Sequence, residues 1–98
     1  MSVEQNLFEV KGDNLYIQGH KVIKAWESFN GWYWFGVEKS YTQDSVIDDK
    51  VYPNDQIWYG YVQGLVDEWG YFSEAELSLI PTVWEIPRKN LPWSGRRS

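Results

Sequence analysis

The side chains of this sequence that could carry acid–base chemistry are its fourteen carboxylates and its one histidine. Glycoside hydrolysis needs two carboxylates a few ångströms apart, and Glu27 and Glu38 share one predicted face of an aromatic-rich hairpin. They lie at opposite ends of that hairpin, with about 7 Å for each same-face step, so their separation is too large. His20 follows a glycine in a predicted turn and lacks an obvious partner to orient it as a base. We therefore expect no catalytic residues and a protein that is not an enzyme.

Oxygen ligands for a metal ion are the next candidates. Asp44, Asp48, Asp49 and Asp55 could bind a hard cation such as Ca²⁺, but their spacing differs from that of an EF-hand loop. A solvated acidic loop is the favoured interpretation. The chain has no cysteine, which excludes disulfides and thiolate zinc sites, and its eight glycines form no phosphate-binding loop. We expect neither a metal nor a cofactor.

Aromatic side chains are unusually frequent, with seven Trp, seven Tyr and four Phe among 98 residues. One face of a small core cannot easily bury four further large aromatic side chains, those of Trp32, Trp34, Trp58 and Tyr59. Packing in the core nevertheless remains the favoured interpretation. Exposed on a sheet, they could anchor a protein partner or stack the bases of a single strand. Together with Glu27, these four residues are candidate binding residues.

The charge is divided between a long acidic part and a short basic end. Residues 1–87 carry a net charge of −9 and residues 88–98 a net charge of +4, which gives −5 for the chain. An acidic body disfavours nonspecific binding to phosphate backbones. The basic end contains Arg96 and Arg97, preceded by Trp93 as an apolar anchor, and these three residues complete the candidate binding set. For this basic end, a frayed and solvated segment is the favoured interpretation, and binding through these residues is the alternative.

The spacing of glycine-containing turns predicts short antiparallel strands. The fold class expected is α+β and mostly β, a small antiparallel sheet or partly open barrel of about five to seven strands with one short helix. Ser73 and Glu76 form a capping box that predicts a helix over 74–79. We expect a single β-rich domain over residues 1–90 and a basic C-terminal end over 91–98. The strands are expected at 7–10, 15–17, 21–29, 32–39, 56–63, 69–72 and 83–86, with a further short strand at 50–52.

The strongest hairpin signal is Asn30-Gly31, which predicts a two-residue type I′ turn. That turn fixes the register and places Trp26 opposite Phe35 in the core, with Glu27 opposite Trp34 on the other face. Both faces are aromatic, so the sheet is either buried on both sides or presents one face as a binding platform. Residues 40–55 are expected to form a long polar loop closed by a turn at 53–55.

Three segments carry a resemblance to a known group of proteins. The first, residues 32–38 (WYWFGVE), looks similar to a Trp-containing strand of that group that ends in an acidic residue. Residues 58–64 (WYGYVQG) and 67–77 (DEWGYFSEAEL) resemble a family of small uncharacterised proteins of plasmids, phages and other mobile elements. Its members combine an aromatic–Gly strand with a Gly-Tyr-Phe-Ser step into a Leu-bearing helix. The resemblance excludes residues 1–20 and 81–98. It implies a mobile-element context and a compact domain, and it assigns no chemistry.

No signal peptide or transmembrane span is recognisable, so we expect a cytoplasmic protein without membrane association. The favoured function is that of a non-catalytic interaction module of a mobile element that binds a host or co-encoded protein. In the extreme case its acidic body imitates DNA and inhibits a nucleic-acid-binding protein of the host. The alternative is a nucleic-acid-binding accessory module that uses sheet aromatics and the basic end.

Overall fold

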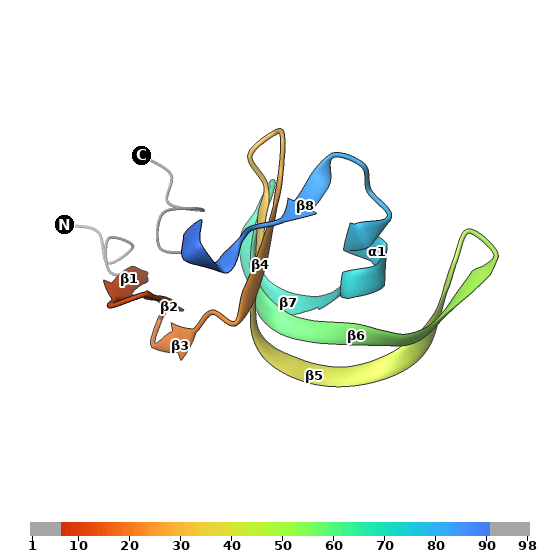
Figure 1. The fold of residues 1–98 in the computed structure, drawn as a ribbon, viewed down its shortest axis with the longest axis horizontal. Helices are drawn as coiled ribbons and strands as arrows, with labels where there is room; N and C mark the ends of the chain where they lie inside the picture. Colours follow the sequence, from red (N-terminus) through yellow and green to blue (C-terminus); the bar gives the residue numbers. More distant parts are fainter. Residues whose placement is uncertain (1–6, 91–98) are drawn as a thin grey trace.

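The computed structural model describes residues 7–90, which form two open antiparallel sheets and one α-helix. The sheets have strand orders β1-β2-β3 and β7-β6-β5-β4-β8 (Figure 1). This confirms the predicted α+β, mostly β class, with open sheets and with eight strands in place of the expected five to seven. The elements are β1 (Phe8–Lys11), β2 (Asn14–Ile17), β3 (His20–Lys21), β4 (Lys24–Ser28), β5 (Tyr33–Ile47), β6 (Lys50–Gln63), β7 (Asp67–Ser73), α1 (Glu74–Ser78), β8 (Val83–Glu85) and the 3-10 helix η2 (Arg88–Asn90).

The longest element is the β5–β6 hairpin, which curves around α1 and extends beyond it (Figure 1). The expected polar loop over 40–55 is therefore wrong, because both strands continue through it. Their connection is only Asp48-Asp49, with φ angles of 52° and 65°, the two left-handed residues that a type I′ turn requires. Asn and Gly are the usual residues there, so the Asp-Asp pair gave a weak signal.

The turn expected at 53–55 is a bulge inside β6. Ser45 pairs with Tyr52 and Gln43 pairs with Asp55, so Pro53 and Asn54 together stand opposite Asp44, and β6 has one extra residue here. Asn54 has a φ of 57° and its N–H donates to the Asp44 carboxylate at 3.1 Å. Proline cannot donate to a ladder, and a bulge is where a strand tolerates it.

The single strand expected over 21–29 is divided between the two sheets. The Val22 N–H donates to the Leu15 carbonyl in β2, whereas the Ile23 N–H donates to the Gly36 carbonyl in β5. Consecutive residues thus bond to different sheets, and the chain passes from one to the other at this point. The sequence shows no glycine or proline here, so nothing local indicated the break.

The β4–β5 hairpin has its turn where the sequence predicted it, but the predicted register is wrong by one residue. Ser28 pairs with Trp32 through a backbone bond of 2.9 Å, and the Gly31 N–H donates to the Ser28 carbonyl at 3.1 Å. Gly31 has a φ of 90°, whereas Asn30 is not left-handed. The loop therefore holds three residues, a turn followed by a left-handed glycine.

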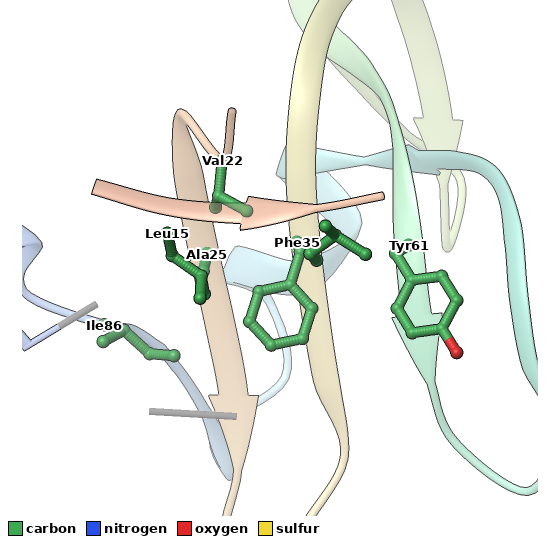
Figure 2. Packing of buried hydrophobic residues seen from close by; sticks show 7 residues of the cluster. Leu15, Val22, Ala25, Phe35, Tyr61 and Ile86 are labelled. Carbon is green, nitrogen blue, oxygen red and sulfur yellow. The ribbon is translucent and has the colours of Figure 1, made fainter. Parts of the chain in front are cut away.

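The shifted register changes which side chains meet. Trp26 pairs with Trp34, and Ala25 pairs with Phe35, so Trp26 and Phe35 lie on opposite faces of the sheet and are not the neighbours that the sequence predicted. Each face of the hairpin packs against its own core. Of the two alternatives that the sequence left open for this hairpin, the structure shows the sheet buried on both sides. The first core is Leu15, Ile17, Val22, Ala25, Phe35, Tyr61 and Ile86 (Figure 2). The second core lies between the sheet and α1 and consists of Trp26, Trp58 and the helix residue Leu77.

Three glycines form a row across the sheet at the start of the curved hairpin. Gly36 in β5 pairs with Gly60 in β6, which pairs with Gly70 in β7, and a bulge follows Gly36 directly. A Cβ on Gly60 would lie 1.8 Å from the Phe35 carbonyl oxygen, and one on Gly36 would lie 2.6 Å from the Trp58 ring. The close approach of the β5 backbone thus requires glycine at position 60, and the Trp58 ring requires it at position 36.

Candidate functional site

Four aromatic side chains form a continuous strip across β5, β6 and β7. They are Tyr41, Tyr59, Trp69 and Tyr71, here called the aromatic strip. Ring centroids of neighbours are 5.1 Å apart for Tyr59 and Tyr71, 5.9 Å for Tyr59 and Trp69, and 6.4 Å for Tyr41 and Tyr71. Such spacings are typical of interacting aromatic pairs, so the strip is one connected surface.

The aromatic strip lies on the same face of the five-stranded sheet as the first core. Part of it lies beyond the area that β1–β3 cover. Tyr59 stands two residues from the core residue Tyr61, so the two share a face. The β2–β3 connection reaches only Trp69, where Gln18 accepts a hydrogen bond from the indole N–H at 3.1 Å and the His20 ring lies at 5.3 Å. Beyond this contact, Tyr71 is 63% exposed and Tyr41 is 50% exposed.

The charges beside the aromatic strip are negative. Exposed Glu38 is the register partner of Tyr59, and exposed Asp67 stands two residues before Trp69 on the same face of β7. No lysine or arginine belongs to β7, and Lys39 of β5 lies over the Trp58 ring at 5.9 Å, in the second core. Aromatic faces attract cations, and the carboxylates add to that attraction, so a cationic group is the ligand that this surface fits.

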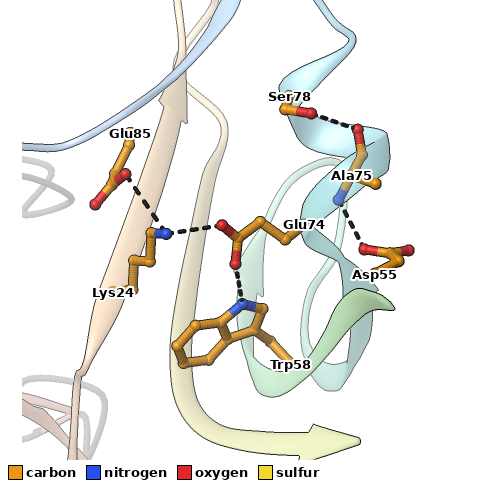
Figure 3. A network of polar contacts seen from close by, with 7 residues as sticks. All are labelled: Lys24, Asp55, Trp58, Glu74, Ala75, Ser78 and Glu85. Atoms are coloured by element: carbon orange, nitrogen blue, oxygen red, sulfur yellow. Dashed lines mark hydrogen bonds and ion pairs between the residues drawn. The ribbon is translucent and has the colours of Figure 1, made fainter. Parts of the chain in front are cut away.

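A polar network on the opposite face anchors α1 (Figure 3). Glu74 accepts hydrogen bonds from the Lys24 ammonium and from the Trp58 indole N–H, both at 2.8 Å, and Lys24 also approaches Glu85 at 3.6 Å. Burial alone would raise the pKa of Glu74, but these two hydrogen bonds and the Lys24 charge outweigh it, and the pKa lies below its ordinary value of 4.5. The network joins β4, β6 and the helix, and its role is structural.

Asp55 is buried and joins the far part of the hairpin to α1. Its carboxylate accepts hydrogen bonds from the Ser45 hydroxyl at 2.6 Å, from the Ser73 hydroxyl, and from the Ala75 N–H at 2.8 Å. Burial would raise the pKa of this group, but the three hydrogen bonds outweigh burial and lower it. Ser73 is also the helix N-cap, as predicted, and accepts from the Glu76 N–H. Asp55 is thus a structural residue, and the prediction that it belongs to a solvated acidic loop is wrong.

Because the pKa values of Glu74 and Asp55 are lowered in the folded protein, we expect the free energy of unfolding to fall in acid. A group with a lowered pKa in the folded state stabilises the protein above its unfolded pKa and loses that contribution as the pH falls through the folded value. Urea unfolding should therefore show a free energy of unfolding that decreases below about pH 4. Replacement Glu74→Gln should cost about 1 kcal/mol at pH 7 and flatten this decrease, whereas Glu76→Gln, an exposed carboxyl on the same helix, should leave it intact. Equal pH profiles for wild type and Glu74→Gln would exclude this role of Glu74.

A concavity of about 420 Å³ lies beside the polar network. Its lining mixes positive and negative side chains, including Lys24, Lys39, Glu74, Glu85 and Arg88, so it favours no one charge of ligand. Within residues 7–90, no three histidine or carboxylate side chains gather closely enough to hold a metal ion. Glu27 pairs with Tyr33, so Glu38 is five residues further along β5, roughly 15 Å of strand. These two carboxylates do not meet.

The structure separates the candidate binding residues that the sequence suggested. Trp58 is buried in the second core, and Trp34 packs against that core from a half-buried position. Trp32 is half-buried against Gly64, with its ring 6.0 Å from Trp34. These tryptophans pack within the fold instead of forming a platform with Glu27, which lies half-buried on the opposite face.

Tyr59 alone of the described candidates belongs to the aromatic strip, and Trp93, Arg96 and Arg97 lie outside the described residues. Sequence reasoning missed Tyr41, Trp69 and Tyr71. The period-two spacing of Trp69 and Tyr71 was a usable signal, because it places both on one face of a strand. Which part of that face is covered depends on the distant β2–β3 connection, and no local pattern encodes it.

Comparison of the chain with models of protein families, with curated proteins and with solved structures finds no match. In the part of the chain from residue 7 to residue 90, no helix has the length and apolar character needed to span a membrane.

Proposed function

We propose that this protein is a non-catalytic binding module that captures a basic segment of another protein on the aromatic strip. The observation that carries the proposal is the connected set of rings at Tyr41, Tyr59 and Tyr71 on an acidic domain. Tyr41 and Tyr71 are exposed, and Tyr59 is half-buried beside Tyr71. Arginine and lysine bind aromatic faces, and each such contact contributes about 0.5–1 kcal/mol at an exposed site and more when desolvated. Tyrosine is also common among the residues that dominate binding at protein interfaces.

The class of partner follows from charge. Glu38 and Asp67 border the rings, and the chain has a net charge of −5, so a positively charged surface is attracted and steered toward this one. Proteins that bind nucleic acid display such surfaces. We propose that the module competes with nucleic acid for a protein of this class, as an acidic inhibitor, and that the partner belongs to the host of a mobile element.

The alternative is that the rings stack the bases of a single-stranded nucleic acid. Sheet aromatics serve that purpose in proteins that combine them with a positively charged groove. Here the neighbouring side chains Glu38 and Asp67 are acidic and would repel phosphates. The protein partner is therefore favoured, and the nucleic acid becomes an outcome of the test.

Loss of one exposed ring should weaken binding without weakening the fold. With a synthetic peptide in which arginine alternates with threonine as the probe, Tyr71→Ser should lower the affinity about tenfold, since an aromatic anchor contributes about 1–2 kcal/mol. The thermal midpoint should change little, because Tyr71 is 63% exposed. The measurement is isothermal titration calorimetry paired with a melt.

Trp84 provides a matched control, because it is 45% exposed and lies on β8, at the opposite edge of the same sheet. Trp84→Ser should leave peptide affinity unchanged. Equal losses for Tyr71→Ser and Trp84→Ser would show that the peptide binds without using the aromatic strip, and the proposal would then be abandoned.

A further inference from the structure

The two edges of the five-stranded sheet differ in how well they are protected. The edge strand β8 has three residues and lies between Pro81 and Pro87, and short length and neighbouring prolines both prevent pairing with another chain. The other edge strand, β7, has seven residues and contains neither proline nor lysine. It thus has neither of the two protections that β8 has.

The outer edge of β7 has no neighbouring strand among residues 7–90, and the face of the sheet at the centre of β7 is also open. A Cβ placed on Gly70, at the centre of the strand, would meet no atom within 4 Å. Asp67, Glu68 and Tyr71 are exposed. Among residues 7–90, β7 pairs only with β6, so alternate N–H and C=O groups along its other side have no strand to bond.

We infer that β7 accepts an extended basic peptide as a sixth strand of the sheet. Main-chain hydrogen bonds to β7 would provide affinity, and alternate side chains of the peptide would lie on the face that holds Trp69 and Tyr71. Arginine or lysine at these alternate positions meets aromatic rings and the Asp67 carboxylate. Charge decides the occupant: β7 carries two acids and no cation, so a basic strand fits and a second copy of this acidic chain does not.

This inference rests on the proposed function, since it assigns the backbone conformation of the basic segment that binds the aromatic strip. Strand addition places a requirement on the peptide that binding to the aromatic rings alone would not. The peptide must present free N–H groups on one side, at every second residue.

Backbone methylation of the arginine–threonine peptide tests this requirement, because it removes N–H donors and leaves every side chain in place. Methylation at one set of alternate residues should weaken binding at least about tenfold, and methylation at the other set should have little effect. Hydrogen exchange should show alternate amides of β7 exchanging at least about tenfold more slowly with saturating peptide, whereas amides of β8 should keep their rates.

Three results would overturn the inference, and they are distinguishable. If the peptide shifts the ring signals of Tyr59 and Tyr71 but both methylated forms bind normally, the proposed function stands and strand addition is wrong. If no peptide binds at the rings, the proposed function itself fails. If β7 amides are already protected in the free protein, in proportion to its concentration, a second copy occupies the edge.

Discussion

Replacing Gly60 by alanine is expected to destabilise the protein by about 3 kcal/mol or to prevent folding. The added Cβ would lie 1.8 Å from the Phe35 carbonyl oxygen, an atom of the backbone that cannot rotate away. Overpacking of a tight site costs about 1–3 kcal/mol even where side chains can adjust, and small domains have only about 5–15 kcal/mol in total. Urea unfolding followed by circular dichroism measures the change.

Gly70 is the matched control for Gly60, since the two are register partners in the same glycine row. A Cβ on Gly70 would meet no atom within 4 Å, and its φ is not left-handed. Gly70→Ala should therefore change the free energy of unfolding by less than about 0.5 kcal/mol. Similar stabilities for the two variants would contradict the close approach of β5 to β6 at this row.

Replacing Trp58 by alanine is the second change with a large expected effect, a loss of about 3–5 kcal/mol. Its ring is 1% exposed, it packs edge-on against Trp26 with centroids 5.8 Å apart, and its indole N–H donates to Glu74. Trp58→Phe keeps much of the apolar volume and loses the donor, so it should cost less, about 2 kcal/mol.

Trp84→Ala is the control for aromatic truncation, because this side chain is 45% exposed at the β8 edge, and its loss should cost less than about 1 kcal/mol. A protein with Trp58→Ala that melts cooperatively at a nearly unchanged midpoint would show that Trp58 is not part of the core. Trp58 would then return to the candidate binding residues.

Local chemistry made some elements predictable. The helix was foreseen because Ser73 caps it through a hydrogen bond within the segment itself, and the alternation of Ile57, Tyr59 and Tyr61 was visible because β6 is regular there. The turn at Asn30-Gly31 was located correctly. Its register was not, because a two-residue and a three-residue loop both suit a glycine at that position, and one residue exchanges the faces of the strand.

Long-range structure hid the rest. The strands through 40–55 contain the buried polar residues Ser45 and Asp55. Ser45 donates a hydrogen bond to Asp55, and Asp55 in turn bonds to the start of α1. The aromatic strip exists because the three-stranded sheet ends at Trp69 and leaves Tyr71 uncovered. Both features depend on contacts between segments that are far apart in the chain. The composition or periodicity of a single segment therefore cannot predict them.

The most direct test of the proposed function is a nuclear magnetic resonance titration that follows the ring signals of Tyr41, Tyr59 and Tyr71. The arginine–threonine peptide should shift all three, and the shifts should weaken as salt is raised, because exposed charges are screened. A single-stranded oligonucleotide of matched length should leave them unchanged. If the oligonucleotide shifts these signals and the peptide does not, the aromatic strip is a nucleic-acid surface and binding to a basic protein segment is excluded.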